Sequence, residues 1–139
     1  MTPVDDLVAW LTRIFDEQES AAKACEEVYP SPWEVSDRGW MAKVQADQPG
    51  FRVVAELEQY PNIDGWLSTR LDHLALHDPA SVLARIAADR QILARCMKVL
   101  SLPASAWEYS DAPDLAEATI RDLAQPYADR EGFREEWRA

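Results

Sequence analysis

The chain has little glycine, no long apolar run and no recognisable leader. Only four of its 139 residues are glycine, and none lies in a glycine-rich loop of the kind that cradles phosphate groups. No run approaches the roughly 18 consecutive apolar residues of a membrane-spanning helix. The first ten residues also lack the basic and apolar regions of a signal peptide. We therefore expect a cytoplasmic protein that neither enters a membrane nor holds a cofactor.

Basic residues are also scarce, because 14 Lys and Arg stand against 25 Asp and Glu, which gives a net charge of −11. Proteins that bind nucleic acids or anionic membranes directly use clustered basic residues, so this balance argues against both partners. A solvated acidic surface is the simplest interpretation. An acidic mimic of a nucleic acid, which would occupy a basic site on another protein, is an alternative.

The sequence contains only two cysteines and two histidines. Cys25 and Cys96 each fall in a helical pattern, where a free thiol behaves as a small hydrophobe, and a reducing compartment is the simpler setting. A disulfide between them remains open. There is no Gly-x-Ser-x-Gly motif around a serine nucleophile. Without a full catalytic constellation, the sequence favours a protein that is not an enzyme.

Hydrophobic residues make up 47% of the chain, enough for one globular domain over residues 1–139. Residues 3–28 are predicted to form a helix, with Thr2 as N-cap and Pro3 as the first helical residue. Apolar residues recur there at intervals of three and four, as on a helix with one buried face.

Residues 33–59 change to alternation of apolar and polar residues. Turn sequences at 37–39 and 47–50 separate three alternating runs, which predicts a three-stranded antiparallel β-meander. A sheet this small needs helices on its apolar face to be stable.

A second long helix is predicted from Pro79 to about Leu100, with Asp78 as its N-cap. The loop at 101–113 is expected to be held by Trp107 or Tyr109, and a last helix covers residues 114–128. An ordered C-terminal arm follows, whose aromatic residues should dock on the rest of the chain. The predicted fold class is α+β, in which the N-terminal helix, the long central helix and the C-terminal helix pack on one face of the meander.

His73 and His77 are the residues that most invite a chemical interpretation. Four residues apart on a helix, two imidazoles share one face and can approach one ion. Asp78 could act as a third ligand or orient a histidine. However, if Asp78 caps a new helix, His77 lies outside it and the helical spacing no longer applies. Because structural histidines that each make one hydrogen bond are the favoured interpretation, we predict no metal and name His73, His77 and Asp78 only as candidate binding residues.

Three segments carry a family resemblance: PSPWEV at 30–35, His-x-x-x-His-Asp-Pro-Ala at 73–80, and YADREGFREEW at 127–137. With them, nearly the whole chain resembles a family of small uncharacterised proteins from actinobacteria and their phages, a domain of unknown function. The resemblance implies no activity. Relatives often carry a Cys- and His-containing insertion before the last helix, and this chain has neither residue type at 101–113.

These observations, with the resemblance, favour a small non-enzymatic interaction or accessory protein, for which a link to phages is one interpretation. It would bind an unidentified protein partner through exposed tryptophan or acidic surface, and homodimerisation is compatible with this reading. Two alternatives from other classes are a metal-dependent hydrolase or nuclease that uses His73, His77 and Asp78, and the acidic nucleic-acid mimic.

Overall fold

The computed structural model describes the backbone of residues 2–38, 41–46, 53–58 and 72–139, and the side chains of residues 2–34 and 72–139. The predicted turn at 47–50, Trp40 and Trp66 lie outside these ranges. The chain divides into two compact units. We call Met1–Glu17 with Ile86–Ala139 the helical unit, and Gln18–Arg85 the strand unit.

The helical unit combines parts of two long helices with the whole C-terminal third of the chain. Helix α1 spans Pro3–Val28 and α3 spans Pro79–Ser101, so each also extends into the strand unit. Helix α4 spans Ala112–Ala124, and three short 3-10 helices lie at Ala104–Trp107 (η1), Gln125–Tyr127 (η2) and Glu135–Trp137 (η3).

The core of the helical unit is built by helices. Its most deeply buried large side chains come from the apolar stripes of α1, α3 and α4, namely Leu7, Leu11, Phe15, Ile86 and Ile120. Burial of such side chains is the main favourable contribution to folding, at about 1.5–3 kcal/mol each. The part of the predicted stripe that belongs to the helical unit therefore lies in the core, and the predicted bounds of the helix, 3–28, are confirmed.

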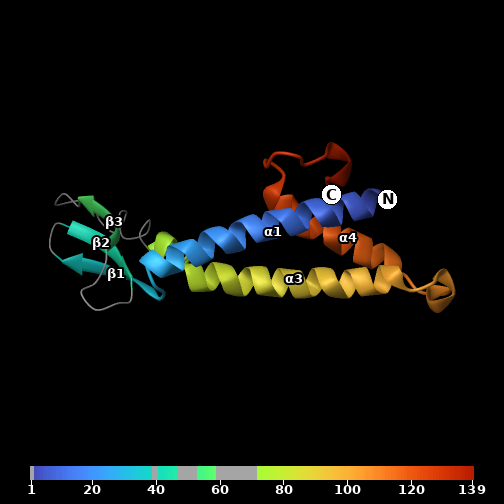
Figure 1. Cartoon of the computed structure of the whole chain (residues 1–139), viewed down its shortest axis with the longest axis horizontal. Coiled ribbons are helices and arrows are strands. Elements are labelled where there is room, and N and C mark those ends of the chain that lie inside the picture. The colour runs from blue at the N-terminus through green and yellow to red at the C-terminus, as the bar shows by residue number, and fades with distance from the viewer. Residues whose placement is uncertain (1, 39–40, 47–52, 59–71) are drawn as a thin grey trace. The chain divides into compact units, whose positions relative to one another are not determined.

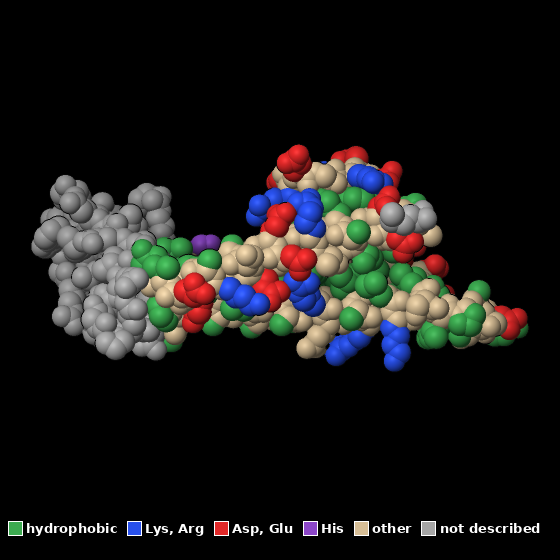
Figure 2. Space-filling model, in the orientation of Figure 1, with side chains coloured by type: hydrophobic (Ala, Val, Ile, Leu, Met, Phe, Trp, Pro, Cys, Tyr) green, Lys and Arg blue, Asp and Glu red, His purple; other side chains and the backbone are tan. Residues whose placement is uncertain are grey.

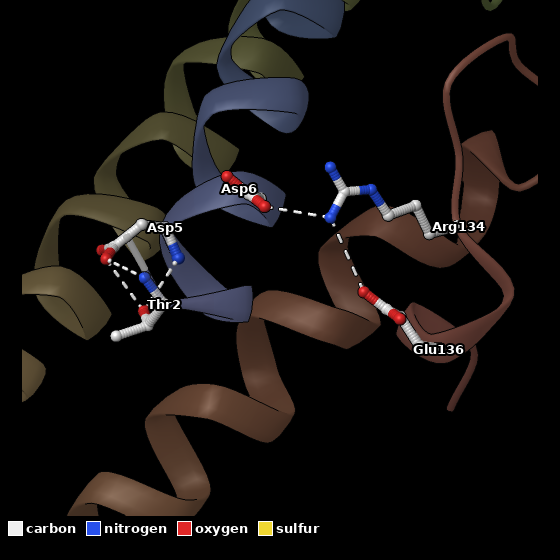
Figure 3. Close-up of polar contacts among 5 residues, drawn as sticks. All are labelled: Thr2, Asp5, Asp6, Arg134 and Glu136. Atoms are coloured by element: carbon white, nitrogen blue, oxygen red, sulfur yellow. Dashed lines mark hydrogen bonds and ion pairs between the residues drawn. The ribbon is translucent and has the colours of Figure 1, made fainter.

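The first turn of α1 is fixed by a reciprocal cap (Figure 3). The Asp5 backbone N–H donates to the Thr2 hydroxyl at 3.2 Å, while the Thr2 backbone N–H and hydroxyl donate to the Asp5 carboxylate at 2.8 and 2.9 Å. These bonds satisfy donors that have no partner within the helix. Thr2 is thus the N-cap, as predicted.

The C-terminal segment returns to the start of α1 and docks there. Trp10, Phe133 and Trp137 form an aromatic cluster with ring centroids 5.5–5.8 Å apart. The Trp10 indole N–H donates to the Glu131 carbonyl at 3.0 Å. Beside the cluster, Arg134 forms an ion pair with Asp6 at 2.9 Å (Figure 3). The predicted docking of the aromatic arm is confirmed.

In the strand unit, β1 (Trp33–Arg38), β2 (Met41–Ala46) and β3 (Val53–Glu58) pair antiparallel in the order β1-β2-β3. Trp33 pairs with Ala46 at one end of the first ladder. The second ladder has a register shift at Val44/Gln45.

The predicted α+β fold class, with the helices packed on one face of the sheet, is wrong. The structure is mostly helical, because α1, α3 and α4 contain 26, 23 and 13 residues while each strand contains six. The physical reason lies in the helices' apolar stripes, which cover one another and the C-terminal segment within the helical unit.

The last helix also differs from its predicted range of 114–128. Helix α4 begins two residues earlier, with Pro113 in its first turn, and ends at Ala124. Pro126 has no backbone N–H to continue the helix, and the chain follows a 3-10 turn from Gln125 instead.

Candidate functional site

His73 and His77 lie together at the surface of the strand unit. Their ring centroids are 4.6 Å apart with an interplanar angle of 67°, and both side chains are exposed. Histidine atoms are visible on the face drawn in Figure 2. The helical residues 72–75 carry His73, and the His77 backbone N–H donates to the Leu74 carbonyl at 3.1 Å in the turn that follows. The structure therefore brings the two predicted imidazoles together although the helical residues end between them.

Asp78, the third predicted residue, is held apart from the imidazoles by its own hydrogen bonds. One carboxylate oxygen accepts the Ser81 backbone N–H at 2.9 Å, and the other accepts the Trp33 backbone N–H at 3.2 Å. Asp78 is 7% exposed and caps α3, as the sequence predicted. It also joins the start of β1 to the start of α3.

Burial of Asp78 acts to raise the pKa of its carboxyl group. The hydrogen bonds from Ser81 and Trp33 act in the opposite direction and prevail, so its pKa lies below the usual value. A carboxylate held ionised by backbone donors is a poor general acid. The hydrolase alternative thus has no proton donor in Asp78.

Ser31 and Glu26, which no sequence motif singles out, complete this junction. The Ser31 hydroxyl accepts the Ala80 backbone N–H at 2.9 Å and donates to the Glu26 carboxylate at 2.7 Å. Together Ser31 and Asp78 satisfy two of the free N–H groups in the first turn of α3. The local sequence Tyr29-Pro30-Ser31-Pro32 does not predict this role, because the pattern around a serine does not indicate a backbone partner 49 residues away.

A second candidate surface lies where α3 leads through η1 into α4. Tyr109 is 96% exposed and Leu115 is 68% exposed, and Met97 and Leu102 are also exposed there. We call these four residues the apolar tip. Figure 2 shows hydrophobic side chains gathered at this end of the helical unit. Contiguous exposed apolar patches mark interaction sites, so we take the apolar tip as a candidate surface.

The loop that carries Tyr109 is anchored by its neighbour. The Trp107 indole N–H donates to the Val99 carbonyl at 3.2 Å, and Trp107 is half-buried. Of the two residues predicted to hold this loop, Trp107 does so and Tyr109 projects into solvent. The phenol is thus presented from an anchored turn.

Charged side chains flank the apolar tip in the chain, acidic ones beside Tyr109 and Leu115 and the exposed Arg95 and Lys98 beside Met97. Glu108, Asp111 and Asp114 are all exposed, and they lie directly beside Tyr109 and Leu115 in the chain. We call these three residues the acidic rim. The predicted role of exposed tryptophan is not supported by the described side chains: Trp10 and Trp137 are buried, and Trp33 and Trp107 are half-buried.

A hollow of about 260 Å³ opens beside the docked C-terminal segment, lined by Pro3, Val4, Leu7, Arg121, Glu136 and Trp137. The Trp137 indole N–H is buried there without a hydrogen-bond partner in the described part of the chain. The charged walls are already paired, Arg121 with Glu117 and Glu136 with Arg134. The hollow is therefore a packing gap beside the docked C-terminal segment and not a ligand site.

The described residues contain no cluster of three or more His, Cys, Asp or Glu side chains that could hold a metal ion. Cys25 and Cys96 are free thiols, and burial raises the pKa of each. A raised pKa lowers the thiolate fraction and so the nucleophilicity of a cysteine. Within the same residues, no helix combines the length and apolarity needed to cross a membrane.

Comparison with known proteins identifies a family and no activity. A family model described as "Family of unknown function (DUF6221)" matches residues 4–139. No curated protein and no solved structure matches the chain. The chain therefore belongs to this family of unknown function, in agreement with the resemblance seen in its sequence.

Proposed function

We propose that this member of the family is a small, non-enzymatic, cytoplasmic interaction protein that binds a partner protein through the apolar tip. The observation that carries the proposal is the 96% exposure of Tyr109 beside an anchored Trp107. Tyrosine is enriched in protein interfaces because it offers a large rigid contact surface with a polar end. Holding it out in water from an ordered turn reduces the entropy lost on binding.

The composition of the tip indicates the kind of partner. Tyr109, Leu115, Met97 and Leu102 would fill an apolar hollow, and the acidic rim would face basic side chains around that hollow. Such charge complementarity mainly accelerates association and selects the partner.

The experiment is affinity capture from the native host with matched variants. We expect wild-type protein to retain a partner that the double variant Tyr109→Ser/Leu115→Ser loses. The control is Leu76→Ser in the strand unit, because Leu76 is 71% exposed and Leu115 is 68% exposed. The tip variant and the control each remove an exposed leucine. A partner that is lost only with the tip variant therefore binds at the apolar tip and not to exposed leucine in general. Retention by all three proteins, or by none, would contradict the proposal.

A further variant separates this proposal from the acidic-mimic alternative. Glu108→Gln/Asp111→Asn/Asp114→Asn removes the charge of the rim and leaves the apolar tip unchanged. We expect slower association and a weaker dependence on salt, with substantial binding retained. If the charge variant abolishes binding and the apolar variant does not, the partner recognises charge, as the mimic alternative requires.

A further inference from the structure

We propose that His73 and His77 form a two-nitrogen site for a late first-row divalent cation such as Zn²⁺ or Ni²⁺. The proposal is independent of the apolar tip, because it concerns residues of the strand unit alone. It also differs from the hydrolase alternative, since it needs neither a third protein ligand nor catalysis. The observation that carries it is the juxtaposition of two exposed imidazoles with centroids 4.6 Å apart.

The separation of the rings matches a shared ion. Imidazole nitrogens bind Zn²⁺ at about 2.0–2.1 Å, so ring centroids about 1.15 Å behind them are about 4.5–5.2 Å apart for ligand angles between about 90° and 109°. The observed 4.6 Å lies within this interval. Because both side chains are exposed, rotation about their side-chain bonds can turn a nitrogen of each ring toward a common point without displacing the core.

The nitrogens are available for binding. Neither imidazole has a hydrogen-bond or ion-pair partner among the described residues. Imidazole suits zinc, nickel and copper, whereas magnesium and calcium prefer oxygen ligands. Water would occupy the remaining coordination positions, since both rings face solvent.

The surroundings favour a cation over an anion. The exposed Asp72 and the ionised Asp78 flank the histidines in sequence, and the whole chain carries a net charge of −11. Both carboxylate oxygens of Asp78 already accept backbone N–H groups, so its contribution is charge and not ligation. An ion held by both rings would tie His77 in the turn to His73 in the preceding helical residues and stabilise that turn.

The test is calorimetric titration of the full chain with ZnCl₂ and NiCl₂ after treatment with a chelator and its removal. We expect one ion per chain. His73→Ala and His77→Ala should each weaken binding by about a hundredfold, because two linked contacts exceed one by at least that factor. The chain has only two histidines, so no other imidazole can replace them. Asp72→Asn is the matched control and should bind nearly as tightly as wild type.

Thermal unfolding with and without metal supplies a second readout. Wild-type protein should melt at a higher temperature with zinc, whereas the double variant His73→Ala/His77→Ala should not respond. Magnesium should leave both unchanged. Absence of zinc or nickel binding to wild type, a single histidine variant that binds as tightly, or undiminished binding to the double variant would each overturn the proposal.

Discussion

At the residue scale, Gly132 shows how one backbone conformation permits a tertiary contact. Its φ of +85° lies in the region that favours glycine, and a Cβ atom there would lie 3.0 Å from the Trp10 indole nitrogen. That indole donates to the Glu131 carbonyl next to the glycine. The residue therefore allows the C-terminal segment to pass directly over the Trp10 ring.

We expect Gly132→Ala to lower the free energy of unfolding by about 1–3 kcal/mol, because alanine would be strained at this φ and would press on Trp10. Urea denaturation followed by tryptophan fluorescence measures the change. Glu131→Ala is the control, since it changes an exposed neighbouring side chain and leaves the carbonyl that binds Trp10. Equal stability of Gly132→Ala and wild type would show that the segment does not dock in this conformation.

Also at the residue scale, the Asp5 carboxyl group makes the stability of the protein depend on pH. Hydrogen bonds from the Thr2 backbone N–H and hydroxyl hold the pKa of the Asp5 carboxyl below its usual value. Because the folded-state pKa is the lower one, the stabilisation is present above the unfolded value of about 3.9 and is lost as the pH falls through the folded value.

Urea midpoints measured between pH 5 and pH 2.5 check this sign. Asp5→Asn should lower the midpoint at pH 5 and flatten its decline toward acid. Asp122→Asn, at an exposed aspartate on α4, should leave the shape of the decline unchanged. If the urea midpoint of Asp5→Asn falls toward acid as steeply as that of wild type, the Thr2–Asp5 cap does not contribute to the acid sensitivity.

At the scale of elements, the caps explain which boundaries the sequence could predict. Thr2-Pro3 and Asp78-Pro79 place a cap before a proline, and both signals act within four residues of the chain. Both helices accordingly begin where they were predicted to begin. Contacts such as the Trp10–Glu131 bond, between residues 121 apart in sequence, have no comparable local signal.

The same difference explains the wrong fold class. An apolar stripe on α1 shows that one face is buried, but it does not show what covers that face. Leu7 and Phe15 would satisfy the same pattern against a sheet, yet they lie in a core with Ile86 and Ile120. The sequence could not predict the exposure of Tyr109 either. A tyrosine and a tryptophan close together in a loop indicate only that one of them anchors the loop.

The junction of α1, β1 and α3 makes an element-scale prediction. Asp78→Ala should destabilise the protein by about 1–2 kcal/mol or slightly more, because it removes a helix cap and leaves the Trp33 N–H without its acceptor. Chemical denaturation measures this, and Asp72→Ala, at an exposed aspartate in the same segment, is the control. If Asp78→Ala and Asp72→Ala lower the free energy of unfolding by the same small amount, the hydrogen bonds of Asp78 do not stabilise the junction.

At the scale of the whole molecule, the prediction of a single domain over residues 1–139 stays a prediction. The division into a helical unit and a strand unit gives each unit its own candidate surface. The apolar tip belongs to the helical unit and the two histidines belong to the strand unit. The two proposals can therefore fail or succeed separately, and a partner lost with Tyr109→Ser need not depend on zinc.

The proposed contact between the apolar tip and a partner protein can be tested inside the cell. The most direct measurement places a photo-crosslinking amino acid at position 109, and in a second protein at position 76, followed by irradiation in the native host. We expect a cross-linked partner from position 109 and none from position 76. A partner that cross-links from position 76 alone, or from neither position, would contradict the proposed contact.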